Sequence, residues 1–120
     1  MIKEAYCSFE VARLLKEKGF NEVVHAYHNI YDKVNLDFNV SVDAPHLQIP
    51  CPTHQMAMAW LREKHIVIVI YPEEFNTEEA VSYWGVDIWA DDNYENLPGN
   101  YPKYEEAVEV ALKYCLENLI

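Results

Sequence analysis

The chain is poor in glycine, and this scarcity excludes several classes of site. Only three glycines occur in 120 residues, at positions 19, 85 and 99. Phosphate-binding loops, dinucleotide-binding turns and nucleophile elbows need clustered glycines, because their backbone adopts unusual dihedral angles or approaches a ligand closely. The sequence therefore argues against a nucleotide-dependent enzyme.

Basic residues are also scarce. The chain has 9 Lys and Arg against 20 Asp and Glu, a formal net charge of −11. Such a charge repels phosphate backbones and anionic lipid, which argues against nucleic-acid and membrane-surface binding. The partners that remain are another protein, a second copy of the chain, or cations.

Long apolar runs and paired cysteines are missing as well. The longest aliphatic run, residues 66–70, is too short to span a bilayer, and the first seven residues contain no apolar signal region. Cys7, Cys51 and Cys115 are an odd number at wide spacing, which indicates no disulfide framework. These features predict a cytoplasmic protein with reduced thiols.

The clearest pattern is the strict alternation of apolar and polar residues over positions 34–43. Alternation of this kind is typical of a strand with one buried and one solvated face. Its polar side chains, which we expect to point away from the core, are Asn35, Asp37, Asn39, Ser41 and Asp43.

The order of predicted elements indicates an α+β fold. Capping residues and apolar periodicity predict three helices, and β-branched or alternating segments predict four strands. The helices are expected at 8–19, 53–64 and 103–120, the strands at 22–28, 34–43, 66–71 and 80–90, with an extended crossover at 44–52 and a loop at 91–102. We therefore expect a single domain, residues 1–120, with αββαββα order: a four-stranded, mainly antiparallel sheet with three helices packed on one face.

Three helical segments resemble a known but uncharacterised family. They are SFEVARLLKEKGF (8–20), PTHQMAMAWLREKH (52–65) and YEEAVEVALKYCLENLI (104–120). Together they look like a small protein family of phages, prophages and mobile elements of gut Bacteroidetes. The resemblance implies an origin rather than an activity, and no functional residue carries over from it.

The best candidate for chemistry is the pair formed by Cys51 and His54, because the start of a helix can bend both side chains toward one point. A thiol and an imidazole are suitable ligands for zinc, or a nucleophile and its base. However, no second Cys and His pair stands at zinc-finger spacing, and no orienting residue or oxyanion loop is recognisable. We expect no metal, no cofactor and no catalytic residue, and keep a small hydrolase or metal enzyme around this pair as an alternative.

The surface offers the other candidate. Trp84 and Trp89 fall on opposite faces of their strand, so at most one lies in the core, and the sequence leaves open which. If Trp84 faces the helices, Tyr83, Asp87 and Trp89 lie on the uncovered face, together with Asn35, Asp37 and Asn39.

An aromatic and acidic face of this kind is typical of protein recognition. The predicted function is therefore a small acidic accessory protein that binds another protein or itself. The alternative that the charge permits is a nucleic-acid mimic, whose carboxylates imitate phosphates and inhibit a host DNA-binding protein.

Overall fold

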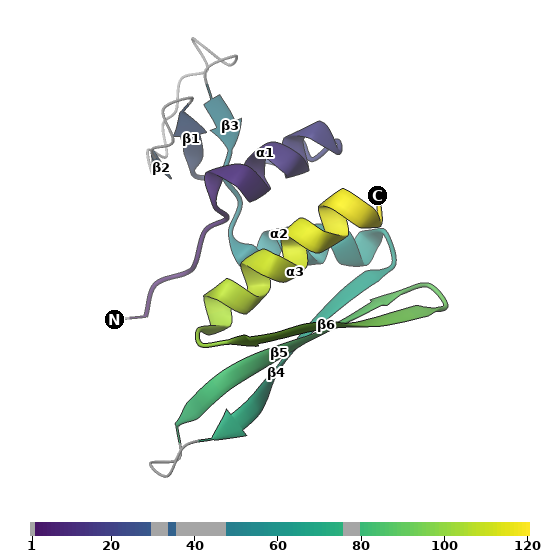
Figure 1. Cartoon of the computed structure of the whole chain (residues 1–120). Helices are drawn as coiled ribbons and strands as arrows, with labels where there is room; N and C mark the ends of the chain where they lie inside the picture. The colour runs from purple at the N-terminus through teal and green to yellow at the C-terminus, as the bar shows by residue number, and fades with distance from the viewer. Residues whose placement is uncertain (1, 30–33, 36–47, 76–79) are drawn as a thin grey trace. The chain divides into compact units, whose positions relative to one another are not determined.

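The computed structural model describes residues 2–29, 34–35, 48–75 and 80–120 of the chain (Figure 1). Within these residues the order is helix, three strands, helix, three strands and helix, which confirms the α+β class. The chain divides into two compact units, unit 1 (Met1–Ala57) and unit 2 (Met58–Ile120), and the boundary falls inside the second helix.

Helix α1 (Phe9–Glu17) has the two ends that its sequence predicts. At its start, Ser8 Oγ accepts a hydrogen bond of 3.2 Å from the backbone N–H of Val11, which is an N-cap. At its end, Gly19 has a φ of 101°, and the N–H of Phe20 donates to the carbonyl of Leu15 at 2.9 Å. This is the Schellman motif that Leu15, Gly19 and Phe20 predict.

Among the described residues of unit 1, three short strands form a sheet. β1 (Tyr27–Asn29) lies between β2 (Val34–Asn35) and β3 (Gln48–Pro50), and it is antiparallel to both. Only the first two residues of the alternating segment 34–43 lie within the described residues, so Asp37 and Asn39 fall outside them.

Helix α2 (His54–Glu63) starts where the sequence predicts it. Thr53 Oγ1 accepts a hydrogen bond of 3.1 Å from the N–H of Met56, so Thr53 is the N-cap. Ala57 and Leu61 of this helix are fully buried.

Unit 2 contains a three-stranded antiparallel sheet in the order β4 (Ile66–Phe75), β5 (Val81–Ala90), β6 (Asn93–Tyr101). Helix α3 (Tyr104–Asn118) packs on one face of this sheet. The Tyr114 hydroxyl of α3 donates a hydrogen bond to Glu95 of β6 and so ties the helix to the edge of the sheet. The buried side chains of α3 are Ala107, Val108, Ala111, Leu112, Cys115 and Leu116.

The predicted four-stranded sheet is wrong, because the strands belong to two separate three-stranded sheets. Of the six strands that the described residues form, two are missing from the prediction: β3, expected as part of a crossover, and β6, expected as a loop. Both contain prolines, Pro50 and Pro98, that usually end strands. Both are edge strands, where a missing N–H need not break the ladder.

Strand β4 is longer than predicted for the same reason. It continues through Pro72 to Phe75, with an irregular register beyond the proline, and it too lies at the edge of its sheet. Among the residues that the structure describes, no helix has the length and apolar content needed to cross a membrane.

The core of unit 2 is tested by two substitutions on α3. Leu112 is fully buried, whereas Val110, on the same helix, is 38% exposed. We expect Leu112→Ala to lower the free energy of unfolding by about 2 to 5 kcal/mol, because it leaves a cavity. Val110→Ala should change it by less than about 1 kcal/mol. Denaturant midpoints measure both, and equal losses would contradict this placement of α3.

Candidate functional site

The face of the β4–β5–β6 sheet opposite α3 is exposed, and the burial along β5 shows which side chains it carries. Val86 and Ile88 are buried, whereas Tyr83 and Trp89 are exposed. Trp84 is half-buried, and its ring meets that of Tyr104 of α3 edge to face at 5.1 Å. Trp84 is therefore the tryptophan of β5 that faces the helix, and Trp89 is the one on the outer face.

Strand register brings further side chains beside Trp89. Val67 of β4 and Tyr94 of β6 are its cross-strand neighbours on the two sides. The rings of Trp89 and Tyr94 lie 4.5 Å apart. We call this surface the open sheet face, and its residues are Val67, Val69, Tyr71, Tyr83, Asp87, Trp89, Tyr94 and Asn96.

Asp87 organises the polar part of the open sheet face. Its Oδ1 accepts hydrogen bonds from the Tyr94 hydroxyl at 2.8 Å and from Asn96 Nδ2 at 2.9 Å. Asn96 Nδ2 also lies 2.9 Å from the Tyr71 hydroxyl and donates to it. The hydrogen bond to Asp87, and to a smaller extent burial, raises the pKa of Tyr94 above its usual value of 10.0. Tyr94 therefore stays a neutral donor at physiological pH.

The absence of a side chain at Gly85 leaves the space that the Tyr71 ring occupies on this face. A Cβ at position 85 would lie 2.3 Å from Tyr71 Cζ and 2.5 Å from its hydroxyl oxygen. No side chain fits there without moving the ring, so the glycine lets Tyr71 lie flat across β5 and reach Asn96.

The structure separates the predicted surface residues into two groups. Tyr83, Asp87 and Trp89 share the open sheet face of unit 2. Asn35 lies on β2, opposite Tyr27 of β1, in the sheet of unit 1. The expectation that all of them share one sheet is therefore wrong.

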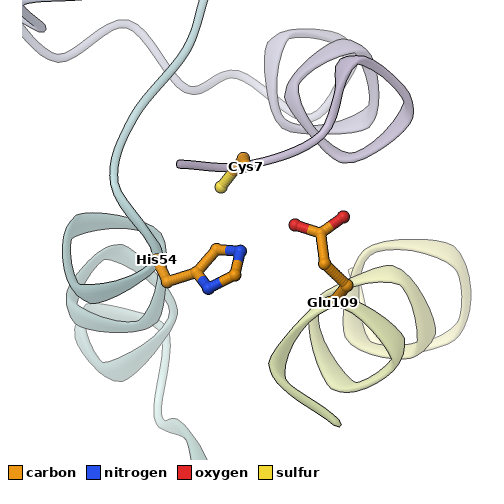
Figure 2. A group of neighbouring side chains, drawn as sticks. All are labelled: Cys7, His54 and Glu109. Atoms are coloured by element: carbon orange, nitrogen blue, oxygen red, sulfur yellow. The ribbon is translucent and has the colours of Figure 1, made fainter. Parts of the chain in front are cut away.

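Unit 1 contains a cluster of two thiols, Cys7 and Cys51, and two imidazoles, His28 and His54. The segment before α1 pairs with the segment before α2: Cys7 N–H donates to Pro52 O at 3.0 Å, and His54 N–H donates to Ala5 O at 2.9 Å. Cys7 Sγ and a ring nitrogen of His54 lie within 4.8 Å of each other, and Figure 2 shows the sulfur facing the ring. Glu109, also drawn there, belongs to α3 of unit 2.

The carbonyl oxygen of Cys7 accepts two side-chain hydrogen bonds. His28 Nε2 lies 2.8 Å from it and Cys51 Sγ lies 3.3 Å from it. Because a carbonyl can only accept, His28 carries a proton on Nε2. Its Nδ1 is buried and has no hydrogen-bond partner among the described residues.

The neighbour of His54 that sequence reasoning missed is Cys7, which lies 47 positions before it. The only local signal for this proximity is that both residues adjoin a helix cap, Ser8 or Thr53. A pocket of about 350 Å³ opens beside the paired segments, lined in part by Tyr6, Cys51 and Thr53.

Comparisons with protein-family models, with curated proteins and with solved structures found no significant match to this chain.

The fit of Tyr71 over Gly85 is tested by a double-mutant cycle. We expect Gly85→Ala to destabilise the protein by about 1 to 3 kcal/mol, because the new methyl group displaces the ring and breaks its hydrogen bond to Asn96. In a Tyr71→Ala background the same change should cost much less. An equal cost in both backgrounds, measured by denaturant unfolding, would refute the contact.

The bond between Asp87 and Tyr94 has a pH signature. A folded-state pKa above 10.0 stabilises the fold at pH values below 10, and this contribution is lost as pH rises through the raised value. Asp87→Asn should therefore lower the pKa of Tyr94. Tyrosinate absorbance, taken as the difference between each protein and its Tyr94→Phe counterpart, measures this shift. An unchanged midpoint would contradict the bond.

Proposed function

We propose that the chain is an accessory protein that binds a basic protein partner on the open sheet face of unit 2. The observation that carries this proposal is the solvent exposure of Trp89, which is 50% exposed. Val67, Val69 and Tyr94 around it are 40%, 39% and 49% exposed. A tryptophan amid contiguous apolar side chains is typical of the centre of a binding surface.

Contacts within the open sheet face order several of its side chains in the absence of a partner. The ring of Trp89 packs against that of Tyr94 with an angle of 48° between their planes, and Asp87 accepts a hydrogen bond from the Tyr94 hydroxyl. Side chains already ordered lose little conformational entropy on binding, so more of the contact energy appears as affinity. This favours a binding role over incidental exposure.

The charges at the ends of this sheet favour a basic partner. Exposed carboxylates stand at both ends, Glu73 and Glu74 on β4 and Asp91 and Asp92 after β5. An apolar centre with acidic ends complements an apolar patch flanked by Lys and Arg. The net charge of −11 opposes close approach of a second copy.

The test compares Trp89→Ala with Val110→Ala. Val110 is a matched control because it is an exposed apolar residue of unit 2 that lies on α3. A partner is first captured from a lysate of a gut Bacteroidetes host and purified, and its affinity for each variant is then measured by calorimetry. We expect Trp89→Ala to weaken binding by more than about 30-fold, equivalent to about 2 kcal/mol, while its melting temperature stays close to that of the parent.

Two further measurements distinguish binding of a basic partner from self-association of the chain. Affinity should fall as salt is raised, because the acidic ends contribute electrostatically. Sedimentation of the purified protein tests self-association. Equal binding by both variants, or a dimer that Trp89→Ala dissociates, would overturn the proposal of a basic partner.

A further inference from the structure

The thiol of Cys7 and the imidazole of His54 lie close together in space although 47 positions separate them in the sequence. Their ligand atoms lie within 4.8 Å of each other (Figure 2), and both residues belong to unit 1. Their exposed fractions are 1% and 5%, so the pair is shielded from solvent. Sulfur and imidazole nitrogen are the donors that zinc and similar borderline divalent ions prefer.

The backbone holds both residues in place. Cys7 bonds through its N–H to Pro52, and His54 bonds through its N–H to Ala5, on either side of the Tyr6 and Thr53 bridge. The carbonyl of Cys7 is fixed in addition by His28 and Cys51. A pair of donors on a rigid frame needs little reorganisation to take an ion.

His28 is a second buried imidazole that contacts Cys7, through the backbone carbonyl. Its side chain is 3% exposed, its Nε2–H donates to a backbone carbonyl, and its Nδ1 has no partner among the described residues. Metal-binding histidines commonly have this arrangement, in which one ring nitrogen donates to a carbonyl and the other keeps a lone pair for the ion. A buried nitrogen without a partner is otherwise costly.

We propose that Cys7 and His54 anchor a site for a zinc-like divalent cation. Binding replaces the thiol proton: the S–H bond of Cys7 breaks, an S–metal bond forms and the proton passes to solvent. His54 contributes the lone pair of a ring nitrogen. The pocket is lined by residues that adjoin the pair in the sequence, Tyr6 before Cys7 and Thr53 before His54.

This site is distinct from a catalytic pair. A nucleophilic cysteine must reach a substrate atom, whereas Cys7 is 1% exposed and does not line the described pocket. A small ion needs far less access than a substrate does. The geometry therefore favours metal binding over thiol catalysis at Cys7 and His54.

The experiment titrates the full chain, freed of metal by a chelator, with Co²⁺ under reducing conditions. Thiolate coordination gives a charge-transfer band in the near ultraviolet, and addition of Zn²⁺ should remove it by competition. We expect one equivalent to bind, and Cys7→Ser or His54→Ala to weaken binding by more than about tenfold. His28→Ala should weaken it less, because His28 holds the backbone carbonyl of Cys7 and does not anchor the ion.

Matched controls test whether metal binding requires Cys7 and His54 in particular, rather than any thiol and any imidazole of the chain. Cys115 is a buried thiol of unit 2, where desolvation raises its pKa to about 12, and Cys115→Ser should leave the titration unchanged. His25→Ala is the control for the imidazole. Circular dichroism of each metal-free variant verifies that it is folded.

A measurement on the unmutated protein keeps the test independent of folding defects. Nitrogen-detected NMR of the histidine rings should show that Zn²⁺ shifts the ring resonances of His54 and not those of His25. Absence of the charge-transfer band, its survival in Cys7→Ser, or a shift confined to His25 would each overturn the proposal.

Discussion

The packing of α3 against one face of the β4–β5–β6 sheet is the contact on which the proposed binding surface depends. Side chains of a strand alternate between faces, so a helix that buries Val86 and Ile88 forces Asp87 and Trp89 to the opposite side. The exposure of Trp89 is thus a consequence of what α3 covers. A shift of register by one residue would bury Asp87 and expose Ile88, so the core of unit 2 and its outer face stabilise each other.

Helices and strands were predictable from sequence to different degrees, for a physical reason. Helix ends are encoded by neighbouring residues, and Ser8, Gly19 and Thr53 cap or terminate helices in the structure as their sequence predicts. Strand boundaries depend on whether a strand lies at the edge or in the centre of its sheet. Pro72 and Pro98 lie within strands because β4 and β6 are edge strands, and position in the sheet is not encoded locally.

The two candidate sites, the open sheet face and the pair of Cys7 and His54, also differ in how far local sequence predicts them. Alternation within β5 is a local pattern, so it predicted that Tyr83, Asp87 and Trp89 share a face. It could not predict which other segment lies beside them, and Asn35 belongs to another sheet. The proximity of Cys7 and His54 results from pairing between two segments 47 positions apart. Nothing in the residues around either one specifies such a pairing.

The two sites also differ in how they relate to the stability of the protein. The open sheet face lies outside the core, so a partner there leaves the fold of unit 2 as it is. Cys7, by contrast, receives hydrogen bonds at its carbonyl from side chains 21 and 44 positions away. These bonds tie the start of α1 to β1 and to the segment before α2.

An ion held by Cys7 and His54 would add one more link between the same segments. Because the unfolded chain does not hold these two donors together, binding would favour the folded form of unit 1. The arrangement around Cys7 is thus suited to coupling metal binding to the stability of unit 1. The proposed metal site and the proposed partner surface thus belong to different units, with buried donors in one and exposed rings in the other.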